Sequence, residues 1–165
     1  MKLIDLVYGW FLKFTNLLQA PLLLAIRLYW GWQFWQAGYG KLTNIQQAVE
    51  NFTNMGVPAP AFNAHFIGLL EATGGVLLIL GLASRLIALP LTINMFTAFV
   101  IADREALHSI FSEPDKFYAA APYTFLFASL LILVFGPGWF SLDTVIAWYR
   151  ARGQNKTAMA ERKIE

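Results

Sequence analysis

Four long stretches of the chain are almost wholly apolar, and the polar residues collect between and around them. The stretches cover residues 20–38, 62–82, 85–102 and 117–135. Each reaches the length of about 17 to 25 residues that an α-helix needs to cross the hydrocarbon core of a bilayer. We therefore predict an all-α membrane protein, a single domain built on an antiparallel bundle of four transmembrane helices.

The segment before the first stretch is amphipathic. In residues 1–19 polar residues recur every three or four positions, and large apolar residues fill the opposite face. This spacing predicts an interfacial helix on the membrane surface, after which the chain turns into the membrane at Pro21. Helical spacing also recurs in the connections at 45–55 and 103–112, which predicts two short external helices.

The segment after the last stretch resembles the first in character. The Gly-Pro-Gly sequence at 136–138 should end the fourth transmembrane helix. Ser141 can cap a new helix, and Asp143 favours the positive end of its dipole. Residues 139–165 are therefore expected to form a second interfacial helix and, from Gly153 onward, a solvated tail.

Composition and charge favour a lipid environment over nucleic acid. Only 13% of the residues are charged, against about 25% in an ordinary soluble domain. The net charge of +2 comes from scattered basic residues that form no continuous stripe. Eight Lys and Arg residues fall on the side that holds both termini and three on the other. This bias predicts a multi-pass protein of a bacterial-type inner membrane with both termini in the cytoplasm.

The residue types present exclude several kinds of redox and metal site. The chain has no cysteine, so it has no disulfide and no thiolate-held zinc or iron–sulfur centre. His65 begins the second span and His108 lies in an external connection, so two axial ligands for a transmembrane haem are not available. We therefore predict no metal site and no intrinsic cofactor, and any electrons must come from a partner protein.

Two ionisable residues interrupt the apolar stretches and are the leading site candidates. Arg27 lies in the first stretch and Glu71 in the second, each on a helix face that also carries small residues. A charge at mid-bilayer costs roughly 2.5 to 3.5 kcal/mol on insertion scales, so such residues usually face the bundle interior. Counted from the cytoplasmic ends, Arg27, Asn94 and Glu71 lie about 10, 13 and 16 Å deep. We predict a buried Arg27–Glu71 pair with Asn94 as its hydrogen-bonding third member.

Other interpretations of these residues stay open. The pair could be a structural staple between two helices. Alternatively, Arg27 could extend to the nearer interface and leave Glu71 protonated, which would suit a proton relay. Weaker candidates for substrate binding are Lys41, His65 and Thr124.

Several short motifs together resemble a known family. They are Arg27, Gly38-Tyr39-Gly40-Lys41-Leu42, Gly56-Val57-Pro58, Glu71-Ala72-Thr73-Gly74-Gly75, Gly81-Leu82-Ala83-Ser84-Arg85 and the run from Phe135 to Asp143. In order and spacing they are similar to the DoxX/DoxD family of small four-helix membrane proteins. The resemblance implies a link to quinones, as in thiosulfate:quinone oxidoreductase or quinol oxidase, and to soluble redox partners. Some members carry a Glu near the start of the fourth span, where this chain has residues 117–122 without an acid.

Three functions follow as hypotheses. The first is a quinone-linked accessory subunit of a redox complex, in which Arg27, Asn94 or Glu71 binds the quinone or relays protons. The second is a structural or assembly subunit without chemistry of its own. The third is a small-solute transporter, which with four spans would require a homo-oligomer.

Overall fold

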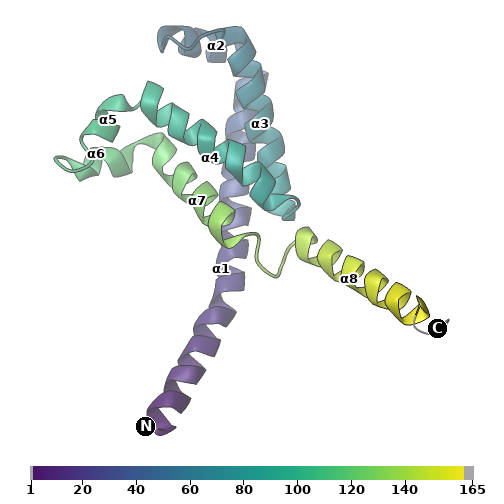
Figure 1. Ribbon diagram of the computed structural model, residues 1–165. Helices are drawn as coiled ribbons and strands as arrows, with labels where there is room; N and C mark the ends of the chain where they lie inside the picture. The colour runs from purple at the N-terminus through teal and green to yellow at the C-terminus, as the bar shows by residue number, and fades with distance from the viewer. Residues whose placement is uncertain (1, 162–165) are drawn as a thin grey trace.

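A computed structural model describes residues 2–161. Within this range the chain forms eight α-helices and no strand. The helices are α1 (Lys2–Thr43), α2 (Ile45–Asn54), α3 (Pro60–Leu80), α4 (Ser84–Ile101), α5 (Arg104–His108), α6 (Pro114–Ala119), α7 (Ala121–Phe135) and α8 (Leu142–Glu161). The prediction of an all-α chain is confirmed, and short helices are present in both connections where they were predicted, at α2 and α5 (Figure 1).

Three helices have the length and composition of membrane spans. They are the segment Val7–Thr43 of α1, together with α3 and α4, while α7 is apolar but has only 15 residues. The predicted fourth stretch at 117–135 is divided, because Ala120 is extended with ψ 132° and separates α6 from α7. Pro122 is consistent with this start, because proline lacks an N–H and is best tolerated in the first turn of a helix.

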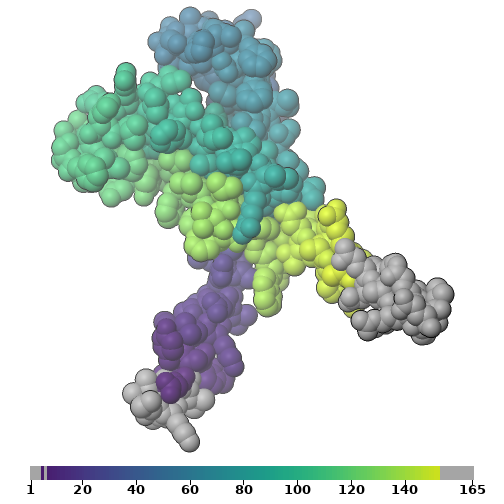
Figure 2. Space-filling model, viewed as in Figure 1, coloured from purple at the N-terminus to yellow at the C-terminus, as the bar shows by residue number. Residues whose placement is uncertain are grey.

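The predicted turn at Pro21 is wrong. α1 is one helix of 42 residues that runs through this proline, so the described part of the predicted interfacial segment, residues 2–19, does not form a separate helix. Pro21 removes only one helical hydrogen bond, and the good helix formers on both sides continue the helix. At 1.5 Å per residue α1 is about 63 Å long, roughly twice a hydrocarbon core. Its N-terminal part projects beyond the other helices (Figures 1 and 2).

Two antiparallel helix pairs make up the body of the molecule. α1 packs along α3, and α4 packs along α7 (Figure 1). The first pair is unusually close: a Cβ added at Gly38 would meet the backbone nitrogen of Ala72 and lie 2.6 Å from the Gly68 carbonyl oxygen. Buried apolar side chains join the two pairs, among them Phe34, Leu78, Leu91 and Ile132. The helix faces that carry small residues beside Arg27 and Glu71 thus lie in close contact.

The turn between α3 and α4 brings these helices together. Gly81 adopts a left-handed conformation with φ +67°, and Leu82 N–H donates to the Leu77 carbonyl at 3.0 Å. This is the hydrogen bond of a Schellman C-cap, which favours glycine at the left-handed position. The turn therefore makes α3 and α4 neighbours, as the short connection predicts.

The C-terminal helix begins where expected and continues further. Ser141 Oγ accepts a hydrogen bond from Thr144 N–H at 3.2 Å, so the predicted helix cap is confirmed. α8 extends to Glu161, so the segment from Gly153 to this residue is helical and the predicted tail is wrong there. The rest of the predicted tail, 162–165, lies outside the described residues. α8 projects away from the bundle (Figure 1).

Candidate functional site

Glu71 is the centre of a buried polar cluster that joins three helices. This residue lies on α3 and is 2% exposed. Lys41 Nζ, from α1, donates to Oε2 of Glu71, and Asn94 Nδ2, from α4, donates to Oε1 at 3.0 Å. Both oxygens of a buried carboxylate therefore have a donor, and an ammonium compensates the charge. The predicted contact between Glu71 and Asn94 is confirmed.

The predicted pairing of Arg27 with Glu71 is wrong. Arg27 is buried, as expected, but its two terminal nitrogens donate to the carbonyl oxygens of Pro137 and Phe140, at 2.6 and 2.5 Å. The register of α1 against α3 explains this: the side chain of Arg27 lies beside Gly81, ten residues and about 15 Å of helix from Glu71. Lys41, a weaker candidate, takes the place of Arg27 at the carboxylate.

Arg27 instead belongs to a second cluster that holds the loop before α8. The backbone N–H groups of Ala83 and Ser84 donate to the two carboxylate oxygens of Asp143, at 2.7 and 3.0 Å. Asp143 N–H in turn donates to the Gly81 carbonyl at 3.0 Å. A carboxylate at these N–H groups caps α4. The sequence indicated Asp143 only as a charge at the start of α8. Its hydrogen bonds to the start of α4 join residues 59 and 60 positions apart, so no local pattern could reveal them.

A cavity of about 630 Å³ opens beside Glu71. Lys41, Glu71 and Asn94 lie on its wall with Asn63, Thr97 and Asp103, and most of the remaining lining is apolar. The apolar lining residues are Ala37, Phe52, Met55, Val57, Pro58, Ile67, Met95, Ala98, Ile101, Ala102, Ala121, Pro122 and Phe125. An apolar cavity with a few converging polar groups is the usual form of a small-molecule site.

The other weaker candidates lie outside this cavity. His65 is exposed on α3, and its Nδ1 lies 2.8 Å from the Ala61 carbonyl oxygen. Thr124 is exposed on α7. Within residues 2–161 no group of His, Cys, Asp or Glu has the arrangement of a metal site.

A surface ion pair shows the contrast with Lys41. Lys116 lies at the surface, 3.0 Å from Glu113 and 3.4 Å from Glu105. The hydrogen bond and charge of Glu113, reinforced by Glu105, raise the pKa of the Lys116 ammonium. Such exposed pairs contribute little to stability or binding.

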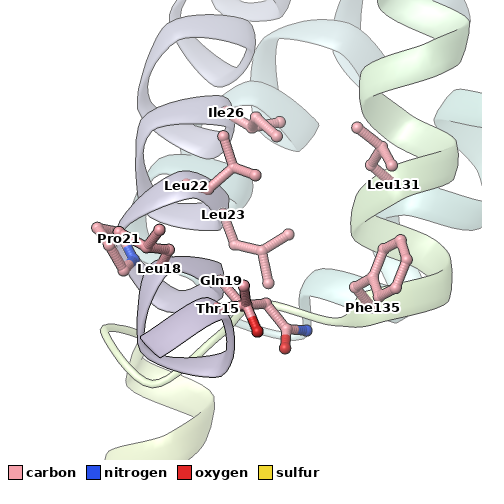
Figure 3. Close-up of a pocket in the computed structure, with 9 residues that line it drawn as sticks. All are labelled: Thr15, Leu18, Gln19, Pro21, Leu22, Leu23, Ile26, Leu131 and Phe135. Atoms are coloured by element: carbon pink, nitrogen blue, oxygen red, sulfur yellow. The ribbon is translucent and has the colours of Figure 1, made fainter. Parts of the chain in front are cut away.

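A second hollow, of about 610 Å³, lies between the N-terminal half of α1 and the end of α7 (Figure 3). Leu22, Leu23 and Ile26 face Leu131 and Phe135 across it, and Thr15 and Gln19 lie at one end. Thr15 already donates to the carbonyls of its own helix. None of the described residues that line this hollow is charged, unlike those at the Glu71 cavity.

Comparison with known proteins decides the family. The DoxX family model matches residues 22–104, half of the chain. The chain belongs to the DoxX family. The matched part of this DoxX protein contains the whole Lys41–Glu71–Asn94 cluster and Arg27, whereas Asp143 lies outside it.

Three relatives of this DoxX protein are membrane or redox-associated by name. The uncharacterized membrane protein Rv3486 of Mycobacterium tuberculosis is 33% identical, over 74% of this chain and 80% of the relative. The inner membrane protein YqjF of Escherichia coli is 30% identical, over 68% and 82%. "Putative oxidoreductase CatD" of Bacillus subtilis is 25% identical, over 74% and 85%. No solved structure matches the chain. The chain is thus a multi-pass membrane protein of the DoxX family.

Proposed function

We propose that this protein is a quinone-binding accessory subunit of a membrane redox complex, with the quinone in the cavity at Glu71. The observation that carries the proposal is a buried Lys41–Glu71–Asn94 cluster on the wall of a 630 Å³ cavity that is otherwise largely apolar. A quinone combines an apolar ring and tail with carbonyl oxygens that accept hydrogen bonds. Lys41 has three N–H donors, of which Glu71 uses one, so the ammonium can also donate to a ligand carbonyl.

The surrounding protein fits this role. The oxidoreductase name of the Bacillus relative supports a redox association. Because the chain lacks cysteine, a partner protein would supply the electrons, and this subunit would bind and orient the ring. We include α7, with α6 extending it, as a fourth membrane crossing, and place both termini in the cytoplasm.

Trp30 provides a reporter for binding. Its ring contacts that of Phe125, a cavity-lining residue, with the two centroids 5.1 Å apart. A quinone in the cavity should quench Trp30 fluorescence. Titration of the purified protein in nanodiscs with 2-methyl-1,4-naphthoquinone should give saturable quenching that largely disappears in a Trp30→Phe variant. Empty nanodiscs provide the partitioning baseline.

Substitutions distinguish binding from assembly. Lys41→Met should weaken quinone binding by about tenfold, the loss of one charge-assisted hydrogen bond. Thr124→Val, a small change outside the cavity, should leave binding unchanged. If a Lys41→Met/Glu71→Met protein binds the naphthoquinone as wild type does, the cluster is only structural and the proposal fails.

A further inference from the structure

The charges around the cavity restrict what its ligand can be. Among the described residues that line it, the charged ones are Lys41, Glu71 and Asp103. Lys41 and Glu71 compensate each other's charge, and no ion pair within the described part of the chain includes Asp103. The cavity thus has one positive and two negative groups, although it belongs to a chain with net charge +2.

We propose that this cavity selects a ligand with a neutral, hydrogen-bond-accepting head and rejects anionic analogues of the same shape, with Glu71 as the residue that sets the selectivity. This inference rests on the proposed function and deepens it. It excludes sulfur oxyanions, fatty acids and other anions from this cavity.

The physical reason lies in how Lys41 is used. An anion entering the cavity would need the Lys41 ammonium as its counter-ion. This ammonium is already paired with the buried carboxylate of Glu71. Asn94 Nδ2 reinforces Glu71, because it donates to the second carboxylate oxygen. The anion would also approach Asp103, a like charge. Like-charge juxtaposition and an uncompensated buried charge both oppose binding. A neutral carbonyl meets neither penalty and can accept a free N–H of Lys41.

Two naphthoquinones form a matched pair of probes. 2-Methyl-1,4-naphthoquinone is neutral, whereas 2-hydroxy-1,4-naphthoquinone has the same ring and is an anion at neutral pH. Equilibrium dialysis against the full-length protein in nanodiscs of neutral lipid, with empty nanodiscs as the blank, measures both affinities. The wild-type protein should bind the neutral ring at least about tenfold more tightly than the anion.

The decisive variant is Glu71→Gln, which keeps the shape and an acceptor for Lys41 but removes the compensating charge. We expect the ratio of the two affinities to move toward the anion by about tenfold or more. Asp103→Asn, which removes the other negative charge and leaves the ion pair intact, should move the ratio in the same direction by less. If Glu71→Gln fails to fold, Asp103→Asn alone tests the proposal. Thr124→Val should leave the ratio at the wild-type value.

The outcomes separate the two proposals. Equal affinity of the wild type for both probes, or a ratio unmoved in both acid variants, overturns the charge selectivity and leaves quinone binding intact. Absence of saturable binding of the neutral ring overturns both. A ratio that favours the neutral ring in the wild type and moves toward the anion in the variants supports the selectivity.

Discussion

At the residue scale, the Lys41–Glu71 pair joins two environments. The side chain of Glu71 is 3% exposed and that of Lys41 is 28% exposed. Lys41→Met leaves the carboxylate buried with Asn94 as its remaining donor, and we expect a loss of roughly 2 to 3 kcal/mol in unfolding free energy, below the usual cost of breaking a fully buried pair. Lys116→Met, in an exposed pair, should cost less than about 1 kcal/mol. Denaturant unfolding in detergent measures both, and equal losses would contradict this difference in burial.

The guanidinium of Arg27 has a structural role that an ammonium cannot reproduce. Its two terminal nitrogens donate to two different carbonyls of one loop, those of Pro137 and Phe140. Arg27→Lys keeps the charge but cannot donate to both carbonyls in the same geometry. We therefore expect a destabilisation of about 1 to 3 kcal/mol, measured by the same unfolding experiment. The control is Arg85→Lys, because exposed Arg85 donates to a single carbonyl, that of Val134. A similar loss of stability at both positions would show that the two simultaneous hydrogen bonds of Arg27 are not the cause.

Sequence reasoning found most residues of the candidate site but paired them wrongly. Polarity inside apolar stretches identified Arg27, Glu71 and Asn94, and all three side chains are wholly or partly buried. Depth along isolated helices could not decide which cation reaches Glu71, because this depends on the register of α1 against α3. That register follows from the contact of Gly38 with Ala72, a tertiary feature that no local pattern encodes.

At the element scale, the close packing of α1 against α3 depends on glycines at the contact, where a side chain would not fit. A Cβ at Gly75 would meet the Gly31 carbonyl oxygen and would lie 2.5 Å from the Trp35 backbone nitrogen. Gly75→Ala should force the two helices apart and cost about 1 to 3 kcal/mol or more in unfolding free energy.

A matched glycine in α1 controls for helix propensity. A Cβ at Gly40 would meet nothing within 4 Å. Gly40→Ala should therefore stabilise the protein by about 0.5 to 1 kcal/mol, the usual gain from replacing glycine inside a helix. Thermal unfolding of both variants checks the opposite signs. A neutral Gly75→Ala protein would mean that the backbones are not in close contact.

Some prolines of this chain lie at the start of a helix, whereas others lie inside one. Pro122 lies in the first turn of α7 and Pro60 begins α3, whereas Pro21 lies inside α1 and does not end it. The sequence could not separate these cases, since one missing hydrogen bond is decisive only where the neighbouring residues also favour a break. Four apolar stretches gave the order of the helices, but the bounds of the last one required the extended residue Ala120.

At the scale of the whole molecule, the cavity lies between the two helix pairs. Its wall combines Ala37, Lys41 and Glu71 from α1 and α3 with Asn94 and Phe125 from α4 and α7. The hydrogen bond from Asn94 to Glu71 crosses between the pairs. A ligand there contacts both pairs, so its binding should stabilise the complete bundle and not one pair alone.

The last prediction concerns how many times the chain crosses the membrane and which end of the bundle faces the cytoplasm. Phe111, which is 96% exposed, follows α4, and Trp139, which is 79% exposed, follows α7. Because α4 and α7 are antiparallel, these two positions lie at opposite ends of the bundle. In the orientation proposed above, the Trp139 end is the cytoplasmic one. The chain lacks cysteine, so a single introduced thiol reports one position only. In intact cells a membrane-impermeant maleimide should label Phe111→Cys and should label Trp139→Cys only after permeabilisation. The reverse pattern would invert the orientation, and labelling of both from outside would mean that α7 does not cross the membrane.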